Sequence, residues 1–327
     1  MKRGCDLFMS PRCHGNVRRL RPMKIITSGA SYLDIDAYAC CIAYAELLNL
    51  QGVPARAVSS AKPNSSVSPT VLSWGAAFHG YTPQVKDEFV LVDVSDYHHF
   101  DPLVVLDQVV EVIDHHPGHE PYWAERLGSA ADIRPIGAAA TLVFRRWQAA
   151  GLLPRISEQS AALLATAILD NTLNLTGQMT TELDIEAYAV LAQRAKLAAN
   201  WPERYFLECQ AAIEADLPSA LAADLKRFKA ESNLPQVFAQ MTVWDADGLL
   251  HKHRNEICGW MAGQGDDWLL NVIGIRDGQS CLLAEPVVSQ QKLNRLLALQ
   301  WQAAMVVVKP SMLRKQLLKL GLNFTPV

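Results

Sequence analysis

The sequence predicts an α/β fold, in which a parallel sheet covered by helices is followed by a smaller α/β unit. Three observations support this. Short apolar runs alternate with helical stretches, which is typical of βα repeats. The runs at residues 88–92 and 109–113 are almost continuously apolar, as in strands buried on both faces of a parallel sheet. The length of 327 residues suits roughly two domains.

The first unit is expected over residues 23–199, where these alternating segments follow one another. Strands are expected at residues 24–27, 53–58, 88–92, 109–113 and 133–136. Helices are expected at residues 36–51, 137–151, 157–169 and 181–198. Strand–helix alternation of this kind predicts a doubly wound sheet.

The second unit is expected to begin after a change of composition near residues 200–202. A linker is expected over residues 200–214, within a charged helical stretch, and a smaller unit over residues 215–327. Its strands are expected at residues 238–244, 268–275, 280–283 and 305–309, and its helix at 289–299. Asp277-Gly278 is a turn signal between two of these strands.

Composition excludes several classes of protein. A formal net charge of −3 argues against a broad basic surface for duplex nucleic acid. No apolar run reaches the ~20 residues that cross a bilayer. The 7 cysteines form no zinc-like pair, which fits a reducing, cytoplasmic location. Residues 1–22 are basic and are expected to be a disordered extension, with Met23 as an alternative start of translation.

Acidic residues recur where the predicted strands end. Because the carboxyl ends of parallel strands form the ligand-binding edge of such a sheet, these side chains are expected to converge. Asp170 closes a helical run and joins the set. The candidate residues are Asp34, Asp36, Asp93, Asp114, His115, His116 and Asp170.

Converging carboxylates repel one another unless a cation lies among them. Oxygen ligands with one or two imidazoles suit Mn²⁺ or Mg²⁺, and two such ions can activate a water and neutralise a phosphoryl group. Asp93 is well placed to bridge two ions. Each residue also has a plainer interpretation. Asp36 can be a helix cap, and Asp96 and the pairs His98-His99 and His115-His116 can be ordinary loop residues.

The ordered motifs resemble those of the DHH phosphoesterase superfamily over about residues 23–190. The motifs are Asp34-Ile35-Asp36, Leu91-Val92-Asp93, Asp114-His115-His116, Gly137-Ala138-Ala139-Ala140-Thr141 and Ile168-Leu169-Asp170. The resemblance implies a parallel-sheet DHH domain, a linker and a smaller C-terminal domain, with the active site in the cleft between them. It is closest to the branch of manganese-dependent family II inorganic pyrophosphatases and prune-like exopolyphosphatases.

The resemblance also implies roles for these residues. One ion would be held by Asp36, Asp93, His115 and Asp170, and the other by Asp34 and Asp93 with water or substrate oxygens. The ions would be Mn²⁺, with Mg²⁺ or Co²⁺ as alternatives. Asp93, Asp114 and His116 would form the catalytic group, in which His116 faces the substrate phosphate and Asp114 orients the histidines.

The chain departs from the pyrophosphatase pattern at two positions. Ala30 stands where those enzymes usually have a histidine ligand, so the second ion site is expected to be weaker. Gly29 before it is a feature shared with the prune-like members. A pyrophosphatase alignment would place Asn171 at the last ligand position, whereas a prune-like alignment places Asp170 there. A neutral amide is a poor substitute for a carboxylate ligand, which favours Asp170.

Several basic or small-residue segments are candidates for binding phosphate. Residues 311–316 resemble the basic motif of this branch, so Lys309, Arg314 and Lys315 are candidate substrate ligands, with a solvated basic helix as the alternative. Residues 137–141 offer either an anion site at a helix N-terminus or close helix packing. The basic cluster at residues 251–254 is expected to be a surface loop.

We therefore expect a metal-dependent hydrolase of pyrophosphate or short inorganic polyphosphate. One alternative is a DHH phosphodiesterase or phosphatase that acts on nucleotides or short oligonucleotides, although no clear glycine-rich C-terminal motif is present. Another is a non-catalytic member that binds a phosphate ligand as a regulator. The expected partner is a small phosphorylated substrate, not duplex nucleic acid or a membrane. The sequence does not decide the oligomeric state, for which a homodimer is one option.

Overall fold

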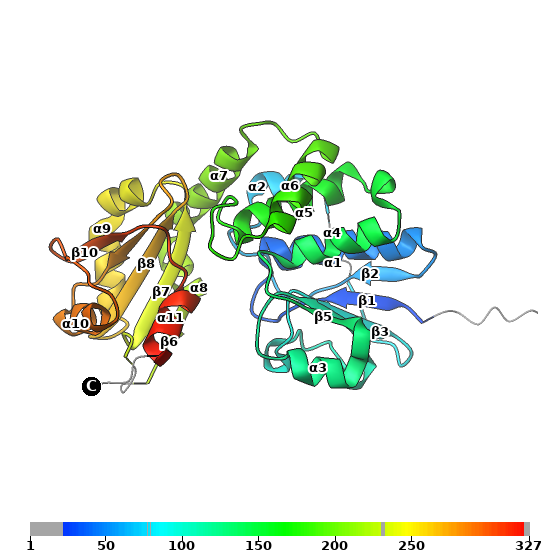
Figure 1. The fold of residues 1–327 in the computed structure, drawn as a ribbon, viewed down its shortest axis with the longest axis horizontal. Helices are drawn as coiled ribbons and strands as arrows, with labels where there is room; N and C mark the ends of the chain where they lie inside the picture. Colours follow the sequence, from blue (N-terminus) through cyan, green and yellow to red (C-terminus); the bar gives the residue numbers. More distant parts are fainter. Residues whose placement is uncertain (1–21, 77, 79, 230–232, 324–327) are drawn as a thin grey trace, which may run out of the picture.

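The computed structural model describes residues 22–76, 78, 80–229 and 233–323, so the expected disordered extension lies outside the described residues except for Pro22. Within these ranges the chain forms two five-stranded sheets, and helix α7 (Trp201–Ala215) lies between them in sequence and in space (Figure 1). The expected α/β architecture with a second, smaller unit is confirmed. No helix of the described residues is long and apolar enough to cross a membrane.

The first sheet is wholly parallel, with the strand order β2-β1-β3-β4-β5. Its strands are β1 (Lys24–Thr27), β2 (Ala55–Ala57), β3 (Glu88–Val92), β4 (Val109–Asp114) and β5 (Ala131–Ile133). The last was expected at residues 133–136 and lies earlier, because Pro135 has no N–H for a ladder and ends the strand.

Helices cover both faces of this sheet (Figure 1). Alternate strand residues explain how: Ile26 and Val90 pack into one core with α1, α4 and α5, whereas Ile25 and Phe89 pack into another with Trp123 of α3. The helices are α1 (Ile35–Leu50), α2 (Pro69–Ser73), α3 (Glu120–Leu127), α4 (Ala139–Ala149), α5 (Glu158–Asn171) and α6 (Glu182–Arg194). Burial on both faces is the reason why the strands are almost continuously apolar.

The second sheet is mixed, with the order β10-β9-β8-β7-β6, and only β7 and β8 run parallel. Its strands are β6 (Leu225–Arg227), β7 (Val237–Val243), β8 (Trp268–Gly274), β9 (Gln279–Leu283) and β10 (Met305–Val308). Its helices are α8 (Leu217–Ala223), α9 (Ala246–Ala262), α10 (Val287–Leu296) and α11 (Arg314–Asn323). One core contains residues of α8 and α9, and the other contains residues of α10 and α11.

The prediction of a surface loop at residues 251–254 was wrong, because this segment lies within α9. Leu249, Leu250, Ile257 and Met261 recur at helical spacing and are buried in the core beneath the sheet. The basic residues between them occupy the remaining faces of the same helix. The helical period was therefore present in the sequence but was masked by the charged cluster.

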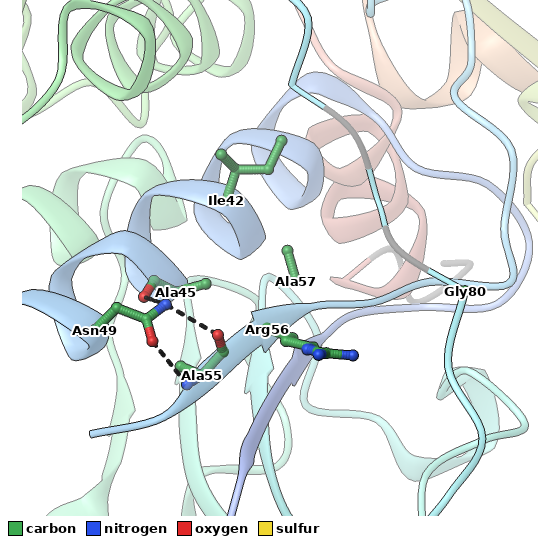
Figure 2. A pocket seen from close by; sticks show the side chains of 7 residues that line it. All are labelled: Ile42, Ala45, Asn49, Ala55, Arg56, Ala57 and Gly80. Carbon is green, nitrogen blue, oxygen red and sulfur yellow. Dashed lines mark hydrogen bonds between the residues drawn. The ribbon is translucent and has the colours of Figure 1, made fainter. Parts of the chain in front are cut away.

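Strand β2 forms one edge of the first sheet, and Asn49 of α1 covers part of that edge (Figure 2). The Asn49 side chain accepts a hydrogen bond from the Ala55 N–H at 3.1 Å and donates one to the Ala55 carbonyl at 2.9 Å. A groove of about 650 Å³ lies beside them, lined also by Ile42, Arg56 and Gly80. It is formed by the C-terminal half of α1, away from the helix start that carries the candidate ligands.

Candidate metal centre

Asp93 lies at the carboxyl end of the central strand β3 and has a left-handed backbone, with φ of 57°. A non-glycine residue in this region costs about 1–3 kcal/mol, and such strain persists mainly at functional sites. The conformation places the buried Asp93 carboxylate beside the end of β4, where its Oδ1 lies 3.3 Å from Nε2 of His115. Two motifs that are separate in sequence thus meet at the expected edge.

His115 is buried and held in one orientation. Its Nδ1 lies 3.1 Å from the carbonyl oxygen of Ile136 and donates to it, because a carbonyl can only accept. In a neutral ring this contact leaves Nε2 with a free lone pair toward Asp93. Nε2 of His115 and Oδ1 of Asp93 are both buried without a hydrogen-bond partner. Two facing atoms that can each act as an acceptor, and that have no hydrogen-bond partner, are suited to hold a cation.

Asp36 lies in the first turn of α1 and is fully buried. Its two carboxylate oxygens accept hydrogen bonds from the N–H groups of Ala139 and Ala140, each at 2.8 Å. The anion at the N-terminus of α4 is therefore this carboxylate, so these two amides are already used within the protein. Oδ1 also accepts a longer contact from the Cys40 thiol at 3.4 Å, whereas Oδ2 keeps a further lone pair for a metal ion.

Gly137, at the start of the same segment, is required for close packing. A Cβ atom at this position would lie 2.6 Å from Cγ2 of Thr172 and 2.7 Å from Oδ2 of Asp184. Asp184 holds the segment in place, since it accepts hydrogen bonds from the Gly137 N–H and the Thr141 hydroxyl. Residues 137–141 therefore pack closely, as one interpretation expected. Their amides also bind an anion, as the other expected, but this anion is a carboxylate of the protein itself.

Electrostatic interactions link Asp34 and Asp170 to the other candidate carboxylates. Burial, followed by the charge of Asp34, raises the pKa of Asp93 well above its usual range. Burial, followed by the charge of Asp93, does the same for the pKa of Asp36. Burial raises the pKa of Asp170 to about 7, a shift that the hydrogen bond from Tyr205 opposes and the charge of Asp34 increases. Each carboxylate disfavours the charge of another, and a shared cation would relieve all of them.

Asp114 holds His115 and His116 in place through hydrogen bonds. Its Oδ1 accepts from the backbone N–H groups of His115 at 2.7 Å and His116 at 3.2 Å, and from Nδ1 of His116 at 2.9 Å. Burial opposes a charge on the His116 ring, but the hydrogen bond to Asp114 and the nearby Asp93 charge raise its pKa. The His116 side chain is 57% exposed, so it can reach a ligand above the carboxylates.

The other loop histidines lie apart from this group. His98, His99 and His119 surround Asp96, at 2.9, 3.7 and 3.6 Å from its oxygens, and the side chains of His98 and His99 are largely exposed. This agrees with the interpretation of His98 and His99 as solvated loop residues. Asn171, the alternative to Asp170, donates to the carbonyl of Ala167 in its own helix.

The three residues of the second unit that were expected to bind phosphate differ in their surroundings. The Arg314 guanidinium donates to the Asp224 carboxylate and, at 2.7 Å, to the Asp224 carbonyl, and it lies 5.7 Å from the ring centroid of Phe238. Its side chain is 12% exposed. Lys309 is exposed, and the side chain of Lys315 lies outside the described part of the chain. Among these candidates, Arg314 already has a carboxylate partner.

Two polar groups that the sequence did not indicate border the centre. The Tyr205 hydroxyl lies 2.9 Å from Oδ1 of Asp170, and the Ser66 hydroxyl accepts from the Ile35 N–H at 2.8 Å. Burial, Asp34 and Asp224, in that order, raise the pKa of Tyr32 to about 12. Nothing in the local sequence marks Ser66 or Tyr205, because their partners lie far away along the chain.

Comparisons with known proteins show which proteins this chain is similar to. No family model matches the sequence. The chain is 28% identical over 233 residues to a probable manganese-dependent inorganic pyrophosphatase of Bacillus licheniformis, which covers 70% of this chain and 74% of that protein. It is 26% identical over 275 residues to the protein of the same name from Streptococcus mutans, covering 80% and 86%.

Solved structures show the same fold. A candidate family II inorganic pyrophosphatase of Methanococcus jannaschii matches with a TM-score of 0.64 at 19% identity, covering 90% of this chain and 96% of that one. An exopolyphosphatase-related protein from Bacteroides fragilis matches with a TM-score of 0.51 at 14% identity, covering 92% and 91%. The resemblance to the DHH phosphoesterase superfamily and the expected fold class are confirmed by these similarities.

Proposed function

We propose that this chain is a metal-dependent phosphohydrolase that uses Mn²⁺ to cleave a phosphoanhydride bond in pyrophosphate or short inorganic polyphosphate. The observation that carries the proposal is the pair of facing, unpartnered atoms on Asp93 and His115, surrounded by three further carboxylates. Relatives that are 28% and 26% identical to this chain are named probable manganese-dependent inorganic pyrophosphatases. The small substrate in this proposal is therefore a phosphorylated one.

The donor set fits Mn²⁺, which accepts carboxylate oxygens together with an imidazole nitrogen. In this proposal one ion is held by Asp36, Asp93, His115 and Asp170, and a second is held by Asp34 and Asp93. When bound, such ions lower the pKa of a water molecule and neutralise charge on a phosphoryl group. Asp93 would supply the shared oxygens, because its charge raises the pKa of Asp36 and the charge of Asp34 raises its own pKa.

The remaining residues act on the substrate. His116 is exposed, and its raised pKa favours the charged ring, which donates a hydrogen bond to a phosphate oxygen. Asp114 fixes the orientation of that ring through Nδ1, leaving Nε2 for the substrate. Arg314, Lys309 and Lys315 of the unit at residues 215–327 are proposed to face the unit at residues 23–199 across the active site, beyond a linker at residues 200–214.

The second ion site is proposed to be the weaker one. Ala30 offers no imidazole, and its N–H is bonded to the carbonyl of His99 at 2.9 Å. Calorimetric titration of metal-free protein with Mn²⁺ should therefore show one tight site and one weaker site. Two equally tight sites would contradict this assignment.

Measurement of phosphate release tests the proposed reaction. Pyrophosphate, tripolyphosphate and a panel of nucleotides would be incubated with Mn²⁺, Co²⁺ or Mg²⁺. We expect turnover of pyrophosphate or tripolyphosphate with Mn²⁺. Turnover of nucleotides alone would instead indicate a phosphodiesterase or phosphatase. Ligand binding without turnover by any metal would indicate a regulatory protein.

A further inference from the structure

Tyr205 is a fully buried residue of helix α7, and its hydroxyl lies at two acceptors. Oδ1 of Asp170 is 2.9 Å away, and the carbonyl oxygen of Ser66 is 2.8 Å away. We propose that Tyr205 is a positioning residue of the metal centre, which holds the Asp170 carboxylate in the orientation that binds the ion. The inference rests on the proposed function and on the assignment of Asp170 as a ligand.

The direction of the hydrogen bond follows from the chemistry of the groups. A phenol has one proton, so it donates fully to only one of the two acceptors. A carboxylate that binds a cation is ionised, and a hydrogen bond to a charged acceptor is stronger than one to a neutral carbonyl. Tyr205 therefore donates to Asp170 when the ion is bound. This bond restricts rotation of a carboxylate that lies in the last turn of α5, where the helix dipole disfavours a negative charge.

The second acceptor ties Tyr205 to the other side of the centre. The hydroxyl of Ser66 accepts from the N–H of Ile35, which lies between Asp34 and Asp36 at the start of α1. The loop that carries Ser66 therefore anchors the helix end with two candidate ligands, while Tyr205 contacts this loop and Asp170 together. A single side chain therefore lies against both the Asp170 carboxylate of α5 and the loop that anchors the start of α1.

Packing keeps the ring of Tyr205 in place. It lies between Trp201 and Phe206 of the same helix, with ring centroids at 5.9 and 5.0 Å. Phe206 in turn stacks on Trp244 of the second unit, with centroids 6.4 Å apart and planes inclined by 18°. Because α7 connects the two units, a helix outside the first sheet contributes to the geometry of the metal ligands.

The test is the Mn²⁺ affinity of metal-free Tyr205→Phe, measured by calorimetry. The substitution keeps the ring and its packing and removes only the hydroxyl. Loss of an outer hydrogen-bond partner of a ligand typically weakens metal binding about 10–100-fold, and we expect a change in this range for the site that contains Asp170. The Mn²⁺ concentration for half-maximal phosphate release should rise equally, whereas kcat at saturating Mn²⁺ should change less than about threefold.

Tyr44→Phe is the matched control. The Tyr44 hydroxyl also donates to a carboxylate, that of Glu111 at 2.8 and 2.9 Å, but this pair is not part of the metal centre. Its Mn²⁺ affinity should equal that of the unaltered protein. Equal affinity in Tyr205→Phe would overturn the inference and leave the proposed function intact. An unaltered protein that neither binds Mn²⁺ nor releases phosphate would instead overturn the proposed function.

A double variant tests whether Tyr205 acts through Asp170. In an Asp170→Asn background, the further change Tyr205→Phe should leave the residual Mn²⁺ affinity unchanged, because the ligand that Tyr205 orients is already impaired. A full additional loss of about tenfold would show that Tyr205 acts by another route and would contradict the inference. Circular dichroism of each variant would establish that the comparison is made between folded proteins.

Discussion

The candidate ligands of the first unit and the basic residues of the second unit are both charged groups near the proposed substrate, but they are built differently. At the sheet edge, atoms of Asp93, Asp114 and His115 are buried without partners, and the carboxylates raise one another's pKa. In the second unit, Asp224 balances the charge of Arg314, and the Arg314 guanidinium lies over the ring of Phe238. We call the sheet edge with Asp93, Asp114 and His115 the incomplete region, because its buried polar atoms lack partners. We call the pair of Arg314 and Asp224 the complete region, because its charges already balance.

This difference predicts that the two regions gain different amounts of free energy when a ligand binds. We expect the incomplete region to bind a cation tightly, because binding would relieve the repulsion and give the unpartnered atoms a partner. The complete region gains less from an anion, because a phosphate group must compete with Asp224 for Arg314. The metal ions are therefore expected to dominate substrate binding, with the basic residues adding a smaller contribution.

The largest effect is expected at the centre of the incomplete region. Asp93→Ala should lower kcat/KM for pyrophosphate by at least about 10³-fold, because it removes an oxygen donor shared by both proposed ions. Steady-state phosphate release with excess Mn²⁺ measures this. Asp107→Ala, which removes an exposed aspartate paired with Arg126, is the control and should have normal activity. Normal activity in Asp93→Ala would exclude the two-ion arrangement.

A second expected effect concerns the stability of the metal-free protein. The raised pKa values of Asp36, Asp93 and Asp170 mean that the folded state keeps protons which the unfolded state releases near pH 4. Unfolding then releases protons, so stability falls as pH rises from about 4 toward and through the Asp170 value of about 7. The thermal midpoint should drop by about 3 °C or more between pH 5 and pH 8.

Mn²⁺ should oppose this loss, since it binds the ionised carboxylates. The stabilisation by saturating Mn²⁺ should therefore be larger at pH 8 than at pH 5. Differential scanning calorimetry at both pH values, with and without the ion, provides the four midpoints. A metal-free midpoint that rises over this range would mean that the carboxylates do not share the site as described.

A smaller effect is expected in the complete region. If Arg314 contacts a phosphate group, Arg314→Ala should raise KM about tenfold with little change in kcat, because a charge-assisted hydrogen bond is lost. Asp224→Asn should lower KM by about twofold to threefold, because the competing carboxylate is removed. Substrate titrations of both variants, read beside their thermal midpoints, distinguish binding from folding. Unchanged KM in both would assign the pair a structural role alone.

The smallest effect is expected on the outer face of α9. Lys252 forms an exposed ion pair with Glu214 at 2.7 Å, and such pairs contribute less than about 1 kcal/mol. Lys252→Ala should change stability by no more than this and should leave the KM for pyrophosphate within about twofold. A larger rise in KM would place the basic cluster at the substrate and would extend the complete region across a second helix.

The sequence predicted the first sheet well, because most of its strands are compact apolar runs, and β3 and β4 lead directly into Asp93 and Asp114. Contacts between distant segments were beyond it. Asp36 binds amides 103 and 104 residues later, and Arg314 is neutralised by Asp224, which lies 90 residues earlier. No local pattern encodes such pairs. Strand β6 was missed for a related reason, since one of its three residues is half-buried, the other two are exposed, and they carry no apolar period.

Helix α9 shows the opposite limit, because its apolar period is regular but a run of four basic or imidazole side chains obscured it. Such a cluster is often assigned to a loop from composition, whereas burial of the flanking leucines decides the structure. The candidate metal centre also depends on contacts that local composition does not reveal. The residue types could be predicted from local motifs, but the orientation of His115 depends on a carbonyl 21 residues away.

The contact between Asn49 and strand β2 has a consequence for how the protein behaves at high concentration. The outer edge of a sheet offers free N–H and C=O groups to any passing extended chain, and is a common starting point for aggregation. Here the amide and carbonyl of Ala55 are both occupied by the carboxamide of Asn49, which imitates the peptide group of a neighbouring strand. A polypeptide that paired at this position would first have to displace that side chain, so the protein carries its own barrier to strand addition.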